Sequence, residues 1–180
     1  MSHDPDATSV RTATADDLAG LSAFAARTFP LACPPWMSAA SIADFVTEQL
    51  SEAAFAGHLA DPDHHVLVAV DGLDEPVGYS LAIHGALPEA PEPWRAERTA
   101  YLSKLYVAPE LHGAGLARTL MDAVRTASLD DGCVAIWLGT NRENLRAQRF
   151  YARCGFSVVA ERRFDVGGTV CIDDVYGLRL

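Results

Sequence analysis

Apolar residues recur at helical and at alternating spacings along the chain, and the two patterns divide it into elements. Between residues 18 and 25 they lie three or four positions apart, which predicts a helix. Residues 14–17 precede it with a Thr and two Asp, the composition of a capping box with an acidic first turn. A loop with several prolines follows at 29–35, and then Ser38 and Ser51 are expected to cap two further helices.

Extended segments are predicted where apolar residues alternate or form short runs between turn residues. In chain order they are 9–13, 66–70, 77–83, 99–107, 134–138, 157–164 and 169–178. The stretch 85–97 is rich in Pro and Glu and poor in core residues, so it is expected to be a mobile loop. Gly167-Gly168 is expected to form the turn of a closing hairpin.

Residues 1–8 carry no such pattern and are expected to be disordered, whereas residues 9–180 are expected to form a single domain. A chain of 180 residues is long enough to bury a proper core. The order of helices and strands predicts a mixed α/β fold built on one sheet.

A turn with two glycines joins the strand that ends at Val107 to a helix predicted over 116–128. Gly113 and Gly115 let the backbone turn tightly, because no Cβ is in the way. Unpaired amides and the positive end of the helix dipole meet at this helix N-terminus, and together they suit a phosphate. The same residues also suit an ordinary strand–turn–helix connection.

A second strand–loop–helix unit follows some thirty residues later, and its helix begins near Asn144 and stops at Gly155. The two units together resemble the GNAT N-acetyltransferase superfamily. Its cofactor loop, [Gln/Arg]-x-x-Gly-x-[Gly/Ala], corresponds to residues 112–117, with His112 where the family usually has Gln or Arg. Its second motif, Asn-x-x-Ala-x-x-Phe-Tyr-x-x-x-Gly-Phe, is met at Asn144, Ala147, Phe150, Tyr151, Gly155 and Phe156.

This resemblance implies a single mixed, mostly antiparallel sheet flanked by helices, in which acetyl-CoA lies between two splayed parallel central strands. Here those strands are 99–107 and 134–138. Backbone groups of the first strand are expected to pair with the pantetheine arm as though it were an extra strand. Asn144 is expected to contact the same arm, although it also suits a helix N-cap. The implied cofactor-binding residues are Leu105, Tyr106, Val107, His112, Gly113, Ala114, Gly115, Leu116, Ala117, Arg118 and Asn144.

Tyr151 is the implied catalytic residue, because the family uses this tyrosine to protonate or hydrogen-bond the CoA thiolate as it leaves. A thiol pKa of ~8.5 lies below the phenol's ~10, so a hydrogen bond to sulfur needs less tuning than full proton transfer. The competing interpretation is a buried aromatic beside Phe150 and Phe156.

The acceptor amine must lose a proton, since a pKa near ~10.4 leaves it almost wholly protonated at pH 7. Many relatives place a glutamate on the strand before the cofactor turn, but residues 101–104 contain no carboxylate. By residue type alone, the candidate bases are Glu97, His84, Asp165, Asp173 and Asp174. Each of them also suits a solvated surface position.

The net charge of −10 is unevenly distributed. Residues 1–100 have a balance of −11 and residues 101–180 a balance of +1, which argues against nucleic acid as a partner. The acidic half favours a cationic acceptor by long-range attraction, although it also serves solubility.

Local sequence similarity to the bacterial polyamine (Pai-type) branch makes a di- or polyamine the expected acceptor. The similarity rests on residues 104–107, 137–139, Asn144 and 173–176. An amino acid, an antibiotic or a protein N-terminus or lysine are the alternative acceptors.

Several other classes of protein fit the sequence poorly. No apolar run approaches the ~20 residues of a membrane helix, and the N-terminus lacks the features of a secretory signal. Four scattered cysteines predict reduced thiols in a cytoplasmic protein without a metal site. A dinucleotide-binding oxidoreductase would need a third glycine after Gly115. A non-catalytic acyl-CoA sensor is the alternative function. Assembly as a homodimer is also expected.

Overall fold

The computed structural model describes residues 8–92, 94–166 and 169–180, with the side chains of 164–171 excepted. The expected disorder at residues 1–7 and the Gly167-Gly168 turn lie outside the described residues. The α-helices are α1 (Leu18–Thr28), α2 (Ala39–Gln49), α3 (Glu52–Ala60), α4 (Leu116–Asp130) and α5 (Leu145–Arg153). The strands are β1 (Ser9–Thr12), β2 (His64–Val70), β3 (Pro76–Gly85), β4 (Thr99–Val107), β5 (Ala135–Asn141), β6 (Ser157–Val166) and β7 (Thr169–Arg179). Three short 3₁₀ turns are η1 (Ala15–Asp17), η2 (Phe29–Ala32) and η3 (Pro109–Leu111).

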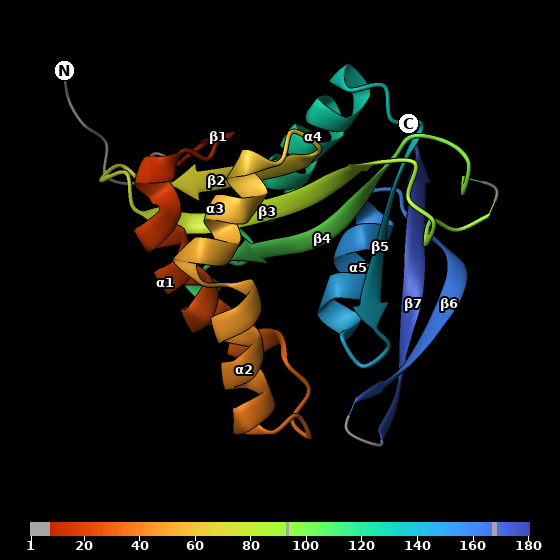
Figure 1. The fold of residues 1–180 in the computed structure, drawn as a ribbon, viewed down its shortest axis with the longest axis horizontal. Coiled ribbons are helices and arrows are strands. Elements are labelled where there is room, and N and C mark those ends of the chain that lie inside the picture. Colours follow the sequence, from red (N-terminus) through yellow and green to blue (C-terminus); the bar gives the residue numbers. More distant parts are fainter. Residues whose placement is uncertain (1–7, 93, 167–168) are drawn as a thin grey trace. The chain divides into compact units, whose positions relative to one another are not determined.

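The strands form one seven-stranded sheet in the order β1-β2-β3-β4-β5-β7-β6 (Figure 1). β4 and β5 run parallel, with Ala100 opposite Ile136 and Tyr101 opposite Trp137. The pairs β1/β2, β5/β7 and β6/β7 run antiparallel. The predicted fold class, a mixed and mostly antiparallel sheet flanked by helices, is therefore confirmed. Among the described helices, none has the length and apolar character needed to cross a membrane.

Contacts divide the chain into two compact units, and each is described by itself. The first unit contains Met1–Ala82 and Lys104–Val124, and the second contains Ile83–Ser103 and Arg125–Leu180. β3, β4 and α4 thus contribute residues to both units.

The core of the first unit lies where α1 and α3 pack beside β2 (Figure 1). Leu21 and Phe24 from the predicted apolar stripe of α1 are buried there, together with Phe55 of α3. Val66, Val68 and Val70 alternate along β2 and present one apolar face to these helices. The predicted caps are also confirmed, because the Ser38 and Ser51 hydroxyls accept backbone amides at 3.0 and 3.3 Å.

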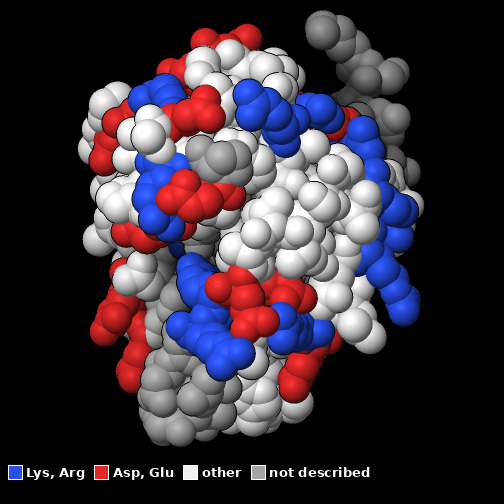
Figure 2. All heavy atoms as spheres, turned by 90° about the vertical axis from the view of Figure 1, so that its right-hand side faces the viewer, with Lys and Arg blue, Asp and Glu red and all other residues white. Residues whose placement is uncertain are grey.

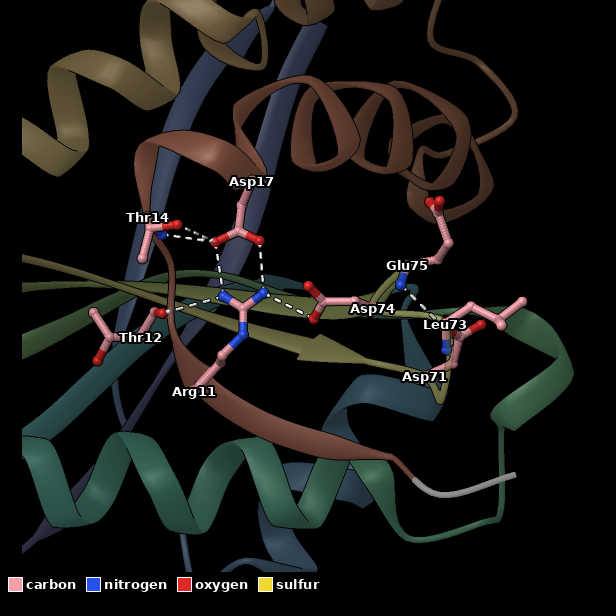
Figure 3. A network of polar contacts seen from close by, with 8 residues as sticks. All are labelled: Arg11, Thr12, Thr14, Asp17, Asp71, Leu73, Asp74 and Glu75. Atoms are coloured by element: carbon pink, nitrogen blue, oxygen red, sulfur yellow. Dashed lines mark hydrogen bonds and ion pairs between the residues drawn. The ribbon is translucent and has the colours of Figure 1, made fainter. Parts of the chain in front are cut away.

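A guanidinium joins three segments at one end of the first unit (Figure 3). Arg11 of β1 donates to both carboxylate oxygens of Asp17 at 2.8 Å and to Asp74, in the turn between β2 and β3, at 3.1 Å. Asp17 also accepts the amide of Thr14 at 2.7 Å, as the predicted capping box requires. The hydrogen bonds from Arg11 lower the pKa of Asp17 to about 2. This network holds the start of the first helical segment against β1.

The core of the second unit is built around two tryptophans. Trp137 of β5 and Trp94 are both buried and share a cluster with Ala90 and Val175. The ring of Trp94 lies over Gly177, where an added Cβ would come within 2.5 Å of it. The expectation that 85–97 is poor in core residues is therefore wrong, because Ala90 and Trp94 are core residues whose partners lie far along the chain.

Candidate active site

The last residues of β4 present alternate backbone groups to opposite sides. The amide of Ala108 donates to the carbonyl of Val77 on β3 at 2.9 Å, and a Cβ on Gly78 would lie 3.0 Å from the Tyr106 carbonyl oxygen. Backbone groups of Tyr106 and Ala108 therefore face β3. Those of Leu105 and Val107 face the other side of the strand, because successive residues of a strand alternate. Leu105 and Val107 thus have the orientation that pairing with an added extended ligand requires.

The side chain of Tyr106 serves the core of the first unit. Its ring is stacked on that of Tyr79 with centroids 5.6 Å apart and lies 6.5 Å from that of Phe29. Burial raises the pKa of the Tyr106 phenol well above its ordinary value. The side chain of Tyr106 is therefore engaged in this core, and its backbone groups face β3.

The turn after β4 holds both of its glycines in the left-handed region. Gly113 and Gly115 each have φ of +91°, and an added Cβ at either position would meet nothing within 4 Å. Glycine is favoured here by backbone conformation, and the space above the turn is open. The sequence expectation that these glycines shape the turn is therefore consistent with the backbone that they adopt.

Most amides of the turn have no acceptor in the part of the chain that the structure describes. The Ala114 amide donates to the Leu111 carbonyl at 3.1 Å, and the amides of Arg118 and Thr119 donate to the Gly115 carbonyl at 2.9 and 3.1 Å. Four donors remain at the helix N-terminus, from Gly113, Gly115, Leu116 and Ala117. Such donors, together with the helix dipole, suit an anion.

His112 stands at the entrance of the turn, and its imidazole contacts the strand. Its Nε2 lies 3.2 Å from the carbonyl oxygen of Val107. Arg118, on the first turn of α4, forms an exposed ion pair with Asp122 at 3.0 Å. This ion pair offsets part of the positive charge that Arg118 could offer to a phosphate.

The remaining predicted residues, Asn144 and Tyr151, belong to the second unit. The Asn144 side chain accepts the amide of Ala147 at 3.1 Å, so its predicted role as the N-cap of α5 is confirmed. Tyr151, two turns into α5, is partly buried among other rings. Its centroid lies 5.7 Å from that of Phe156 and 6.1 Å from that of Tyr176. Packing fixes the Tyr151 ring, and both its structural and its catalytic interpretation are compatible with that position.

Three of the candidate bases, His84, Asp173 and Asp174, are engaged with other side chains. His84 is buried, with Nδ1 2.8 Å from Asp131 and Nε2 3.3 Å from Ser128. Asp173 accepts from Arg162 at 2.9 Å, and Asp174 accepts from Arg142 at 2.7 Å. The side chain of Asp165 lies outside the described residues, and Glu97 contributes its amide to a bond with the Trp94 carbonyl.

These pairs fit the general character of the surface around β6 and β7, where Arg side chains are interspersed with Asp and Glu (Figure 2). Arg162 and Arg142 bind two of the candidate carboxylates. The ion pairs therefore favour a structural role for Asp173 and Asp174.

One residue that the motifs did not single out is Lys104 of β4. It is partly buried, and burial lowers the pKa of its ammonium group. Its signal in the sequence is compositional, since it is the one lysine in a chain with 13 arginines.

Comparison with known proteins places this geometry in a family. Residues 26–156 match the model of the acetyltransferase (GNAT) family. An uncharacterised N-acetyltransferase of Mycobacterium tuberculosis is 46% identical over 154 residues, which cover 85% of this chain and 89% of that protein. A thialysine N-ε-acetyltransferase of Bos taurus is 30% identical over 102 residues, which cover 56% of this chain and 59% of that protein.

Solved structures give the same answer for the fold. The PaiA N-acetyltransferase of Thermoplasma acidophilum, in complex with coenzyme A, has a TM-score of 0.77 at 19% identity. The match covers 97% of this chain and 99% of that one. The chain therefore belongs to the acetyltransferase (GNAT) family and is an acetyl-CoA-dependent acetyltransferase.

Proposed function

We propose that the protein transfers the acetyl group of acetyl-CoA directly to a primary amine of a small cationic acceptor, with a di- or polyamine favoured. The observation that supports the cofactor half most directly is the turn after β4. Its four amides without acceptors, from Gly113, Gly115, Leu116 and Ala117, point from one helix N-terminus and suit the pyrophosphate. Leu105 and Val107 turn their backbone groups to the side where the pantetheine arm would pair.

The chemical step needs few groups from the protein. The acceptor nitrogen forms a bond to the thioester carbonyl carbon, and the bond from that carbon to sulfur then breaks. The Tyr151 hydroxyl donates a hydrogen bond or a proton to the departing thiolate sulfur. The proton that the acceptor nitrogen loses goes to a base of the protein or to water.

Three observations support a cationic acceptor. Residues 1–100 carry the charge balance of −11, which attracts polycations. The relative from Bos taurus is named for transfer to the ε-amine of thialysine, a small amino acid. The structural neighbour from Thermoplasma acidophilum bears the PaiA name, that of the branch that the sequence resembles.

An acceptor panel tests this proposal. Purified protein is supplied with acetyl-CoA and one amine at a time, and release of the CoA thiol is followed. We expect spermidine, spermine or a related diamine to react faster than neutral amines, and added salt to raise KM for the polycation more than for acetyl-CoA. An amino acid, aminoglycoside or peptide that exceeds every polyamine about 10-fold in kcat/KM, about 1.4 kcal/mol, would contradict the polyamine part alone.

The same assay separates catalysis from mere binding. A sensor would bind acetyl-CoA, and would gain thermal stability from it, without releasing thiol in the steady state. If calorimetry detected no binding of acetyl-CoA at millimolar concentration, the whole proposal would be rejected.

A further inference from the structure

A cross-strand ion pair spans one face of the sheet in the second unit. Arg162 of β6 lies directly opposite Asp173 of β7, and its guanidinium donates to the Asp173 carboxylate at 2.9 Å. The hydroxyl of Tyr101 on β4 is a further hydrogen-bond partner of this guanidinium. The Arg162 side chain therefore reaches from the edge strand across β7 and β5 to a side chain of β4.

A glycine of β5 leaves the space that this guanidinium occupies. A Cβ on Gly139 would lie 2.8 Å from Nη2 of Arg162 and 3.2 Å from Oδ2 of Asp173. Gly139 is two residues beyond Trp137, whose ring is stacked on that of Tyr101 with centroids 4.4 Å apart. A carboxylate, a phenol hydroxyl and bare backbone thus surround one space. We refer to this space, bounded by Tyr101, Gly139 and Asp173, as the cation slot.

The cation slot lies just beyond the paired part of β4 and β5. The described pairing of these strands is at Ala100/Ile136 and Tyr101/Trp137, and Gly139 follows the second of these pairs. In the proposed function, on which this inference rests, acetyl-CoA lies between the same two strands. Its pyrophosphate is placed beyond the end of β4, so the acyl end of the arm points back toward the paired start of the strand. The slot is therefore on the acyl side of the cofactor path.

The cation slot and Tyr151 lie on opposite faces of the sheet. Side chains alternate along β7, so Asp173 and Val175 point to one face and Tyr176 points to the other. Val175 shares a cluster with Trp137, whereas the ring of Tyr176 lies 6.1 Å from that of Tyr151 on α5. An acceptor that approaches over the slot therefore comes from the face opposite to the tyrosine that is proposed to act on the leaving sulfur.

The two partners of the ion pair differ in their exposure. The side chain of Asp173 is 10% exposed, whereas that of Arg162 is 47% exposed and belongs to the edge strand. A carboxylate buried to this extent needs a cation beside it, because an unpaired charge there is costly. Arg162 can turn into solvent, where water hydrates its charge, but Asp173 cannot. The slot therefore admits the exchange of one cation for another, and an acceptor ammonium group is such a cation.

We infer that the cation slot binds the second ammonium group of a diamine or polyamine acceptor, and that Arg162 occupies the slot when no acceptor is bound. The reacting amine must be neutral when it attacks, so the charge that Asp173 recognises belongs to another nitrogen of the same molecule. That ammonium group donates to the Asp173 carboxylate and to the Tyr101 hydroxyl once Arg162 has moved away. Asp173 thus acts in recognition of the acceptor and not as the base.

Two acceptors that differ in one amino group test this inference. 1,4-Diaminobutane and butylamine have the same kind of reacting amine, and only the diamine has a second nitrogen for the slot. We expect wild-type kcat/KM for thiol release to favour the diamine at least about ten-fold, as a hydrogen bond to a charged group allows. Asp173→Asn keeps the shape of the side chain without its charge and should bring the ratio toward one. Arg162→Met removes the competing cation and should raise the ratio.

Arg163→Met and Glu161→Gln are the matched controls. These two side chains form an ion pair of 2.9 Å on the same strand, but they point to the other face of the sheet. Both variants should keep the wild-type ratio, and all four should bind acetyl-CoA with the wild-type Kd. If Arg162→Met lowered the ratio as Asp173→Asn does, the ion pair would be a structural clamp and the inference would be wrong. An unchanged ratio in Asp173→Asn would overturn it as well.

A second measurement does not depend on turnover. 1,4-Diaminobutane is titrated calorimetrically into protein saturated with coenzyme A. We expect its Kd to rise at least about ten-fold in Asp173→Asn and to fall in Arg162→Met. If the diamine bound in this way but the wild type released no thiol with any amine, the proposed function would fail while the diamine site stood. An active wild type whose affinity for the diamine did not depend on Asp173 would overturn the site alone.

Discussion

The imidazole Nε2 of His112 lies 3.2 Å from the carbonyl oxygen of Val107. A carbonyl can only accept, so Nε2 carries the hydrogen and donates it. This bond fastens the first residue of the turn after β4 to the last residue of that strand. The side chain that departs from the Gln or Arg usual in the family therefore has a definite structural role here.

His112→Ala is expected to weaken acetyl-CoA binding without abolishing it. One such hydrogen bond contributes about 1 kcal/mol, which corresponds to roughly a five-fold rise in Kd when the turn loses its tether. Calorimetric titration measures the change, and His112→Gln, which keeps a donor, serves as the control. Equal Kd values for His112→Ala and wild type would show that the tether does not organise the turn.

Gly115→Ala is expected to lower both stability and acetyl-CoA affinity. A side chain at φ of +91° costs about 1–2 kcal/mol of backbone strain, and its Cβ would enter the open space above the turn. Gly132→Ala is the matched control, because Gly132 has φ of +72° and equally open surroundings but follows the other end of α4. Thermal unfolding should show a loss in both variants, and acetyl-CoA titration a loss in Gly115→Ala alone.

Tyr151→Phe keeps the ring and its packing against Phe156 while it removes the hydroxyl. We expect kcat to fall about 10²-fold, with the Kd for acetyl-CoA nearly unchanged, since the hydroxyl acts on the leaving sulfur. Steady-state thiol release measures kcat. Tyr176→Phe, whose ring lies 6.1 Å from that of Tyr151, should retain wild-type turnover. A Tyr151→Phe variant with wild-type kcat would leave Tyr151 a structural aromatic.

Asp17→Asn is expected to destabilise the protein in a pH-dependent way. The Asp17 carboxyl has its pKa lowered from 3.8 to about 2, chiefly by Arg11, so its ionised form stabilises the fold at neutral pH. This contribution, about 2 kcal/mol, is fully present above the unfolded pKa and is lost as the pH falls from about 4 to 2. Denaturant unfolding between pH 2 and 7 should show the loss in wild type.

Asp74→Asn is the control for this measurement. Asp74 contacts the same Arg11 guanidinium at 3.1 Å, but its side chain is largely exposed. Exposed ion pairs contribute little, so we expect less than about 1 kcal/mol at any pH. If Asp17→Asn lost as much stability between pH 4 and 2 as the wild type, that loss would come from other carboxylates.

Local patterns predicted the elements of the fold because the forces that set them act over a few residues. The hydroxyls of Ser38 and Ser51 each cap a helix by accepting the amide three residues ahead, and the Asn144 side chain does the same for α5. Gly113 and Gly115, in the turn after β4, have the positive φ that a tight turn of this kind favours. In each case a residue and its near neighbours in the sequence are enough to predict the local structure.

Contacts between distant segments could not be predicted in this way. His84 and Asp131 are 47 positions apart, and their hydrogen bond depends on how the sheet and α4 meet within the second unit. Arg162 and Asp173 face each other only because β6 and β7 pair in one register. The candidate bases were chosen by residue type, and residue type does not reveal such partners.

The surroundings of Lys104 are another case, because it lies beside Phe45, 59 positions earlier in the chain. Only the rarity of lysine in the composition pointed to it beforehand.

The burial of Trp94 over Gly177 also gives the protein a natural optical probe. Of its three tryptophans, Trp94 and Trp137 are buried in the second unit, whereas Trp36, in the first, is 43% exposed. Buried indoles emit at shorter wavelength than hydrated ones, and aqueous quenchers reach them poorly. Iodide or acrylamide should therefore quench the Trp36 emission first. A red shift of the emission that remains would report unfolding of the second unit without any added label.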